Sequence, residues 1–267
     1  MLFQKHLYIQ AHAVSDQGKV RTNNEDNFFA DGSCNPDPQN GGEVRIEKCR
    51  LKSHVFAVCD GMGGESFGEE ASAIAVEAIK EYFPVMKKSH GKELTSEVDH
   101  FVFTVNRRIR DMVEARKCRN SGTTLAMLCF QDGNAYPYYI GDSRIYLYNG
   151  YDLYALTKDQ TLAAERLQFG FYTPEEAEMS NDRNKLMHFL GEDKKRKGMS
   201  ATAQPPIKLK SGMRFLICSD GLTDMCSDLT LYEVLSVSGI DHARTLVDMA
   251  VDSGGVDNAT AIVMEIL

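Results

Sequence analysis

Two apolar segments that stop abruptly at an aspartate restrict the fold of this chain more than any other feature. One reads VFAVC and is followed by Asp60 and four glycines within eight residues; the other reads RFLIC and is followed by Ser219 and Asp220. A continuous apolar run is typical of a strand that is covered on both faces. Both segments therefore predict a buried strand that ends in a carboxylate, and the glycines after Asp60 leave room for another group to approach it closely.

Strand patterns recur along the chain and are mostly of the antiparallel, hairpin type. Asp132-Gly133 is a turn signal, and Asn149-Gly150 predicts a two-residue hairpin turn. Strands are predicted over residues 7–14, 54–59, 123–130, 135–156 (two runs), 213–221 and 258–267.

Helical periodicity is clearest in residues 66–83 and 96–117, where apolar residues recur three and four apart. Ser66 and Glu69 match a capping box at the start of the first helix. Hairpins in the middle of the chain, with helices on either side, favour stacked sheets covered by helices over an alternating βαβ arrangement. Weaker helices are predicted over 159–169, 174–180, 229–237 and 241–252.

The domain organisation predicted from the sequence is simple. The chain has no repeat, low-complexity tract or Pro/Ser-rich linker, which favours one domain over residues 1–267. Residues 157–204 are the part least like a sheet, and we expect them to form a surface subdomain.

Composition argues against several classes of function. There are 30 Lys and Arg against 38 Asp and Glu, a net charge of −8, which argues against non-specific nucleic-acid binding. Seven cysteines without C-x-x-C spacing predict free thiols in a reducing compartment. The N-terminus is too polar for a signal peptide, and no apolar run approaches the ~20 residues of a membrane span. We therefore expect a soluble, cytoplasmic monomer with neither nucleic acid nor a membrane as partner.

Acidic residues stand at the ends of several predicted strands. A single Asp-Gly after a strand is usually only a turn, but here the pattern repeats. Clustered carboxylates would repel one another and raise their pKa values, and a divalent cation would relieve this repulsion. Ligands made only of oxygen favour Mg²⁺, Mn²⁺ or Ca²⁺ over Zn²⁺. The candidates are Glu25, Asp26, Asp60, Asp142, Asp220, Asp224 and Asp257.

Other catalytic motifs are missing from the sequence. There is no G-x-x-x-x-G-K-[ST] loop, no G-x-S-x-G elbow and no EF-hand loop. The seven histidines show no H-x-H or H-E-x-x-H spacing, so a histidine zinc site is unsupported. No cysteine has an arginine six positions later, which argues against a cysteine-nucleophile phosphatase.

Seven segments form a pattern that runs in order from residue 18 to residue 263. They read GKVRTNNEDNF (18–28), FAVCDGMGGESFGEEAS (56–72), SGTTLAMLCF (121–130), YIGDSRIYLYNG (139–150), LTKDQT (156–161), RFLICSDGLTD (214–224) and DNATAIV (257–263). Each segment is a weak signal alone. Together they resemble the metal-dependent type 2C protein serine/threonine phosphatases in their bacterial form.

The resemblance implies an α+β fold, a four-layer αββα sandwich in which two antiparallel β-sheets pack face to face and are flanked by helices. Residues 157–204 would be its flap subdomain. It implies hydrolysis of phosphoserine and phosphothreonine through a metal-activated water at a binuclear Mg²⁺ or Mn²⁺ centre. The implied partners are phosphorylated Ser/Thr proteins, among them a cognate Ser/Thr kinase.

The resemblance also assigns a metal role to six residues. Asp60 would bridge two cations, and the carbonyl oxygen of Gly61 would bind one of them. Asp142 would bind a third, weaker cation. The remaining ligands would be Asp26, Asp220 and Asp257.

Three further residues would act around the cations. Glu25 and Asp224 would lie just outside the ligands, where Glu25 would hold water. Arg21 would bind the substrate phosphate, because its planar fork suits two oxygens at once. The predicted catalytic residues are Asp60, Asp220 and Arg21.

The chain departs from the family pattern in a few places. Met62 stands where many eukaryotic members have a histidine, and Gln160 replaces the histidine of a T-x-D-H element, for which we expect a packing or flap role. Residues 31–53 are an insertion that predicts a long hairpin or a mobile loop.

Two other functions stay open at this point. A catalytically silent member could serve as a binding and regulatory module, although such members usually lose metal carboxylates and this chain keeps them. A phosphatase of small phosphate esters is the second, because the aspartates respond only to a phosphoryl group.

Overall fold

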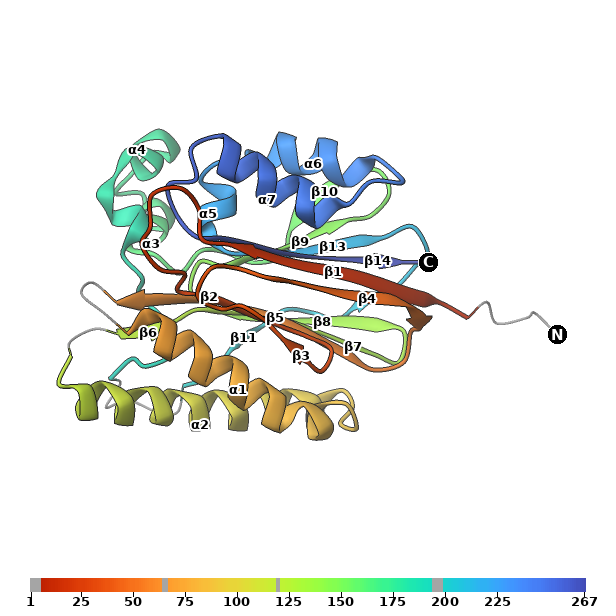
Figure 1. Cartoon of the computed structure of the whole chain (residues 1–267), viewed down its shortest axis with the longest axis horizontal. Coiled ribbons are helices and arrows are strands. Elements are labelled where there is room, and N and C mark those ends of the chain that lie inside the picture. Colours follow the sequence, from red (N-terminus) through yellow and green to blue (C-terminus); the bar gives the residue numbers. More distant parts are fainter. Residues whose placement is uncertain (1–5, 64–66, 119–120, 194–198) are drawn as a thin grey trace.

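Two β-sheets stacked face to face, with helices on both outer faces, make up the centre of the computed structural model (Figure 1). The structure describes residues 6–63, 67–118, 121–193 and 199–267. Its elements are β1 (Tyr8–Asp16), β2 (Asp26–Ala30), β3 (Ser33–Cys34), β4 (Glu43–Arg50), β5 (His54–Gly63), α1 (Gly68–Met86), α2 (Lys92–Arg116), β6 (Ser121–Thr123), β7 (Leu125–Gln131), β8 (Asn134–Ile140), β9 (Arg144–Tyr148), β10 (Leu153–Ala155), α3 (Leu162–Gln168), α4 (Pro174–Met179), the 3₁₀ helix η1 (Asn181–Asn184), β11 (Thr202–Ala203), β12 (Ile207–Lys208), β13 (Arg214–Cys218), α5 (Asp220–Thr223), α6 (Asp228–Ser236), α7 (His242–Asp252) and β14 (Ala259–Ile266).

Both sheets are antiparallel throughout the described part of the chain. The first has the strand order β10-β9-β13-β14-β1-β4 and is covered by α6 and α7. The second has the order β11-β8-β7-β5-β2-β3, with β12 beside β8 and β6 beside β5, and is covered by α1 and α2. This is the αββα layering that the resemblance implies.

Three apolar layers explain why the strands read as continuous apolar runs. In β5, Val55, Ala57 and Cys59 face α1 and α2, whereas Phe56 and Val58 face the first sheet. Successive side chains of a strand point to opposite faces, and here both faces are buried. Alternation between polar and apolar residues is therefore lost in the central strands, as the sequence predicted.

The predicted helices all occur, with shifted ends. Helix α1 runs to Met86, past Pro84, and α2 begins at Lys92, four residues before its predicted start. The predicted N-cap Ser66 lies outside the described residues; the structure has Phe67 at the N-cap of α1, without a side-chain cap.

Two local predictions are wrong. The hairpin at Asn149-Gly150 has a four-residue connection, since Tyr148 pairs with Leu153 and the side-chain oxygen of Asn149 accepts bonds from the next turn residues. Residues 31–53 are neither one hairpin nor a loop. They contain β3, which pairs with β2, and β4, which crosses to the other sheet and pairs with β1.

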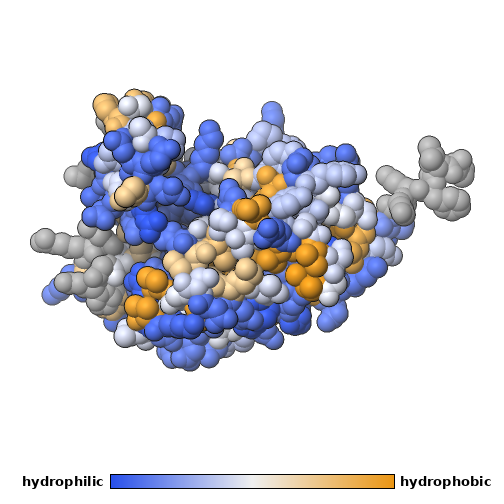
Figure 2. All heavy atoms as spheres, turned by 90° about the horizontal axis from the view of Figure 1, so that it is seen from above, coloured by the Kyte–Doolittle hydropathy of each residue, from blue (hydrophilic) through white to orange (hydrophobic). Residues whose placement is uncertain are grey.

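The strands deliver their acidic ends to one end of the sandwich. Residues 157–204, predicted to be a flap and called the flap from here on, contain α3, α4 and η1, and these helices lie at the same end, while the C-terminus and the start of β1 lie at the other (Figure 1). The face shown in Figure 2 is mostly hydrophilic, with small separate hydrophobic groups, as is usual for surface exposed to solvent.

Candidate metal centre

Strands β2 and β5 place two of the predicted carboxylates directly opposite each other. Asp26 begins β2 and Asp60 lies near the end of β5, and the two residues are partners in the ladder. Three more aspartates arrive from other connections: Asp142 from the turn before β9, Asp220 as the first residue of α5, and Asp257 just before β14. The structure thus brings together acids that are up to 231 positions apart, since 257 − 26 = 231.

Main-chain bonds fix the position of Asp60. Its carbonyl oxygen accepts from Thr124 N at 2.8 Å and from the Thr123 hydroxyl at 2.9 Å, and its own N–H donates to the Thr124 hydroxyl at 3.0 Å. Gly61 is held by Glu25, whose carbonyl oxygen accepts the Gly61 N–H at 3.1 Å. A Cβ at Gly61 would overlap the main-chain oxygens of Gly68 and Glu25, so only glycine fits.

Buried hydroxyl groups hold the carboxylate of Asp26. The Ser219 hydroxyl donates to Asp26 Oδ2 at 2.6 Å and itself accepts from Thr260 N at 3.0 Å. Asp26 is only 2% exposed. Ser219 therefore links the end of β13 to the start of β2.

The aspartates raise one another's pKa values. Burial raises the pKa of Asp26 to about 8 against the lowering effect of the bonds from Ser219 and Thr260, and the charges of Asp220 and Asp257 add smaller raising contributions. The pKa of Asp60 lies well above its ordinary value. Burial is the largest cause, followed by the charges of Asp26, Asp220 and Asp142. The pKa of Asp142 is also raised, by burial and then by Asp220. Burial and Asp257 raise the pKa of Asp220 to about 6.

The donor set of this group fits a hard divalent cation. All of its side-chain donors are carboxylate oxygens, and their mutual repulsion would be relieved by positive charge between them. Among the residues that the structure describes, no three Asp, Glu, His or Cys side chains lie in an arrangement that would itself hold a metal ion.

Arg21 and Glu25 lie beside Asp257. The Arg21 guanidinium donates to Asp257 Oδ2 at 2.5 Å, and against the effect of partial burial this carboxylate raises the pKa of Arg21. Burial and then Glu69 raise the pKa of Glu25. Half of the Arg21 side chain is exposed, so the guanidinium can reach an anion at this edge.

Sequence reasoning missed the residues that hold these acids in place. Asn258 accepts the Glu25 N–H at 2.8 Å and donates to the carbonyl oxygens of Gln17 and Asn23. Ser219, Thr123 and Thr124 act in the same way on Asp26 and Asp60. All four lie in the segments that carry the resemblance, and a buried polar residue next to a candidate aspartate was the signal that could have found them.

Comparison with known proteins places the chain in a family. The sequence model described as "Protein phosphatase 2C" matches residues 45–252. The chain belongs to the protein phosphatase 2C family. Protein phosphatase PhpP of Streptococcus pneumoniae is 30% identical over 92% of this chain and 93% of its own length. Serine/threonine protein phosphatase PstP of Mycobacterium tuberculosis is 30% identical over 98% of this chain, which spans only 46% of that protein.

Solved structures agree with the fold. The catalytic domain of PstP in complex with two manganese ions has a TM-score of 0.78 and 30% identity, and the match covers 98% of this chain and 99% of that one. The Streptococcus agalactiae serine/threonine phosphatase has a TM-score of 0.82 at 24% identity, which bears on the fold alone.

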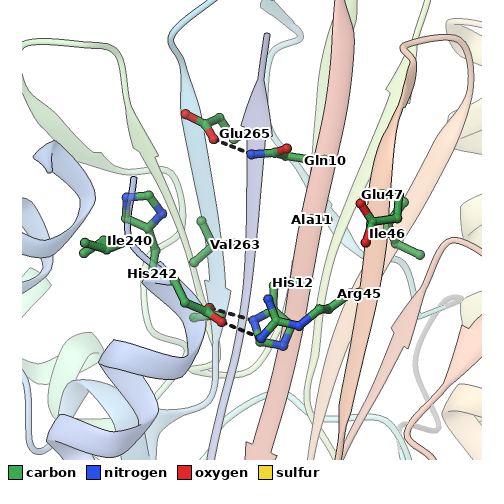
Figure 3. A pocket seen from close by; sticks show the side chains of 12 residues that line it. Gln10, Ala11, His12, Arg45, Ile46, Glu47, Ile240, His242, Val263 and Glu265 are labelled. Atoms are coloured by element: carbon green, nitrogen blue, oxygen red, sulfur yellow. Dashed lines mark hydrogen bonds and ion pairs between the residues drawn. The ribbon is translucent and has the colours of Figure 1, made fainter. Parts of the chain in front are cut away.

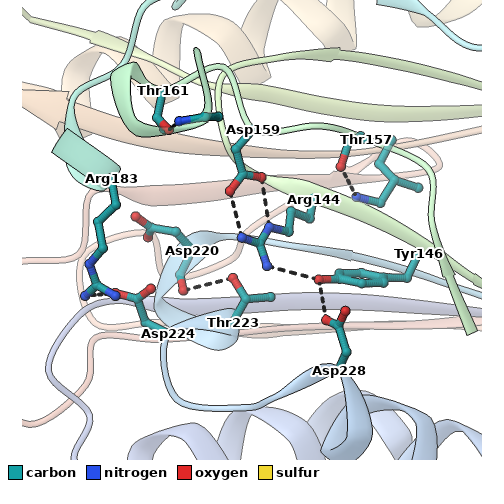
Figure 4. A network of polar contacts seen from close by, with 12 residues as sticks. Arg144, Tyr146, Thr157, Asp159, Thr161, Arg183, Asp220, Thr223, Asp224 and Asp228 are labelled. Carbon is teal, nitrogen blue, oxygen red and sulfur yellow. Dashed lines mark hydrogen bonds and ion pairs between the residues drawn. The ribbon is translucent and has the colours of Figure 1, made fainter. Parts of the chain in front are cut away.

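One side of this family member's carboxylate group opens into a cavity of about 340 Å³ beneath the flap, called here the flap-side cavity. Two of its acids, Asp159 and Asp224, are matched with arginines, as Figure 4 shows. Arg144 forms two bonds to Asp159, at 2.9 and 2.7 Å, and Arg183 reaches from η1 to Asp224 at 3.1 Å. Asp142 and Asp220 also line this cavity.

Gln160 ties the flap to the turn that carries Asp142. Its side-chain oxygen accepts the Gly141 N–H at 2.9 Å, and its side-chain nitrogen donates to the Thr202 hydroxyl at 2.9 Å. The flap role expected for this residue agrees with these contacts.

The other side of the carboxylate group opens into a cavity of about 510 Å³, called here the insertion-side cavity because residues 38–40 of the insertion form one wall. Its walls also include Asp26 and residues from the first two turns of α1. The side chains around it are mainly amides, hydroxyls and carboxylates, among them Thr22, Asn23, Gln39, Asn40, Glu69 and Glu70.

A third cavity, of about 180 Å³, lies on the outer face of the first sheet (Figure 3). His12 and Arg45 both bind the carboxylate of Asp241, at 2.7 and 2.6 Å, and Gln10 binds Glu265 at 2.7 Å. These groups largely satisfy one another, so this cavity offers little to a ligand. No helix in the described residues is long and apolar enough to cross a membrane.

Proposed function

We propose that this chain is a metal-dependent protein phosphatase that hydrolyses phosphoserine and phosphothreonine at a centre of two Mg²⁺ or Mn²⁺ ions. The observation that carries the proposal is the group of buried aspartates with mutually raised pKa values at one end of the sandwich. Such a group is costly unless a cation binds there. The names of the relatives, and the two manganese ions in the PstP structure, support the same reading.

In this proposal six residues hold the cations. Asp60 and the Gly61 carbonyl oxygen lie centrally, with Asp142 toward the flap for a third, weaker ion. When bound, the two main cations would supply an activated water at neutral pH and offset the charge of the phosphoryl oxygens. The other ligands are Asp26, Asp220 and Asp257.

The chain's own groups would position the substrate and the ligands. Arg21 would leave Asp257 for two oxygens of the phosphate, since a guanidinium binds phosphate in a bidentate manner. Glu25 would accept hydrogen bonds from ordered water, and Asp224 would hold Arg183 and thereby the flap. Ser219 keeps Asp26 oriented through its donated bond.

The remaining elements of the proposal concern context. Residues 1–267 would act as one unit with 157–204 as its flap, as a monomer in the cytoplasm. Its substrates would be phosphorylated Ser/Thr proteins, a cognate Ser/Thr kinase among them. The free state of all seven cysteines agrees with a reducing compartment.

The test is hydrolysis of a phosphothreonine peptide with Mn²⁺, with EDTA, and with Mn²⁺ and the variant Asp220→Asn. We expect activity only with Mn²⁺, and a loss of about 100-fold or more in Asp220→Asn, because the variant removes a negatively charged ligand without touching the core. Asp248 is exposed on α7. Asp248→Asn is therefore the matched control and should keep the wild-type rate.

The outcomes separate the alternatives. Wild-type rates in Asp220→Asn would contradict the role of this aspartate in the metal centre. No hydrolysis by folded, Mn²⁺-loaded protein would favour the silent binding module. Faster hydrolysis of nucleotides or sugar phosphates than of the peptide would favour a phosphatase of small esters.

A further inference from the structure

We infer that the insertion-side cavity binds the residues next to the phosphorylated Ser or Thr of the substrate and selects basic side chains there. This inference rests on the proposed function, because it assumes that a phosphopeptide is the substrate.

The insertion-side cavity lies next to the proposed phosphate site. Asp26 belongs both to the aspartate group and to the wall of this cavity. Arg21, proposed to hold the phosphate, is followed directly by Thr22 and Asn23, which line the cavity. Successive residues of an extended peptide are about 3.3–3.6 Å apart, so a residue one or two places from the phosphoryl group would lie over these side chains.

The insertion-side cavity is preformed. Main-chain bonds tie the insertion to its neighbours: Asn24 N to Gln39 O at 3.2 Å, Gln17 N to Asn40 O at 3.2 Å, and Ser15 N to Gly42 O at 2.9 Å. A site that is ordered before its ligand arrives loses less entropy on binding. Its volume of about 510 Å³ lies in the range of ligand sites.

The walls of this cavity carry amide and acidic side chains that suit a basic peptide. Amide side chains such as Asn23, Gln39 and Asn40 both donate and accept, and this suits the N–H and C=O groups of a peptide main chain. The charged side chains that line this cavity are Asp26, Glu69 and Glu70, and no Lys, Arg or His is among its described lining residues. An acidic flanking residue would be repelled there, and a basic one attracted.

Glu69 is the group best placed to meet a basic side chain. Glu70 already has a partner, because Arg116 binds both of its oxygens at 3.0 and 3.2 Å. Glu69 is exposed in the first turn of α1, and from the side chains of the described residues it accepts only a long bond, 3.5 Å, from Asn23.

The experiment uses two phosphothreonine peptides that differ only at the residues flanking phosphothreonine, arginine in one and glutamate in the other. We measure kcat/KM for both with Mn²⁺ at 0.15 M salt, where the screening length is about 8 Å. Wild type should prefer the arginine peptide by about tenfold in kcat/KM. A ratio of this size corresponds to the free energy of one or a few exposed charge pairs. Glu69→Lys should abolish or reverse the preference.

Glu77→Lys is the matched control. Glu77 is exposed on the same helix, eight residues or about 12 Å further along the axis, and makes the same change in net charge. It should keep the wild-type preference. Because each variant is judged by its own ratio between two substrates, a general loss of activity cancels.

Each result decides something definite. Equal rates on the two peptides in wild type, or an equal change of ratio in Glu69→Lys and Glu77→Lys, would overturn the inference and leave the proposed function standing. No hydrolysis of either peptide would overturn the proposed function and the inference with it.

Discussion

The two cavities beside the aspartate group treat their acids in different ways. In the flap-side cavity, Asp159 and Asp224 each have an arginine partner, at 2.7 and 3.1 Å. In the insertion-side cavity, Glu70 is paired but Glu69 keeps its charge exposed to the opening. Away from the aspartate group, the flap side thus has two paired acids and the exposed Glu178, and the insertion side has one paired acid and the exposed Glu69. The same centre can thus hold a phosphate while one side still attracts positive charge.

The largest expected effect comes from the aspartates that the two cavities share. Without metal, burial and the neighbouring acids raise the pKa of Asp26, on the insertion side, from 3.8 to about 8, and that of Asp220, on the flap side, to about 6. A carboxyl group with a raised folded-state pKa contributes stability below its unfolded pKa, and this contribution is lost as pH rises to the folded value. In EDTA, Tm should therefore fall by about 5 °C or more between pH 5 and 8.

Two variants separate the contributions of Asp26 and Asp220 to this fall in Tm. Asp26→Asn should flatten the fall between pH 6 and 8, whereas Asp220→Asn should act mainly below about pH 6, because its own carboxyl is already ionised above that value in the folded state and its charge makes only a small contribution to the raised pKa of Asp26. Thermal unfolding followed by circular dichroism suits a chain without tryptophan. A Tm that stays level or rises with pH in EDTA would contradict the raised pKa values.

A second contrast concerns how firmly each cavity wall is held. Gly41, in the insertion wall, has φ +110° and a Cβ there would overlap the Ser15 carbonyl oxygen, whereas Gly170, in the flap, has φ +74° and open space around it. Gly41→Ala should lower the free energy of unfolding by about 3 kcal/mol and Gly170→Ala by about 1 kcal/mol. Urea unfolding measures both. Equal losses of unfolding free energy would mean that the main chain of the insertion adapts to a Cβ as readily as that of the flap.

The sequence predicts the aspartate group better than it predicts the cavities around it. Apolar runs that end at Asp60 and Asp220 identify buried strands and their ends by local pattern alone, and the seven ordered segments supply the layering. The position of β4 depends on its pairing with β1, in the other sheet from β3 and β5, and nothing in residues 43–50 names that partner. Such long-range pairing is outside the reach of periodicity.

The insertion wall was unpredictable for a related reason. Residues 35–42 are polar and rich in turn formers, so they indicate a loop whatever lies beside them. Only the bonds from Asn24 and Gln17 to Gln39 and Asn40 turn this loop into one side of a cavity. The roles of Ser219 and Asn258 likewise arise from contacts across more than 190 positions, since 219 − 26 = 193 and 258 − 25 = 233.

The smallest expected effects come from two ion pairs, Arg144–Asp159 on the flap side and Arg116–Glu70 on the insertion side, which should differ in strength as their burial does. Arg144 and Asp159 are each about one third exposed or less and share two bonds, and Arg144 also binds the Tyr146 hydroxyl. Arg144→Met should lower the free energy of unfolding by about 2 kcal/mol, because it leaves Asp159 without its partner in a half-closed site. Arg116→Met, on the insertion side, should cost no more than about 0.5 kcal/mol, since that pair is more exposed.

The comparison of these variants bears directly on the charge of each cavity. If Arg116→Met proves as costly as Arg144→Met, Glu70 depends on its arginine as strongly as Asp159 does, and the insertion side is closer to neutral than its exposure implies. Glu69 would then attract basic peptides without help from Glu70, as the inference assumes. If the costs differ as expected, Arg144 and Asp159 form the firmer pair, the Arg116–Glu70 pair is weak, and the acidic opening on the insertion side remains available to a basic residue beside the phosphate.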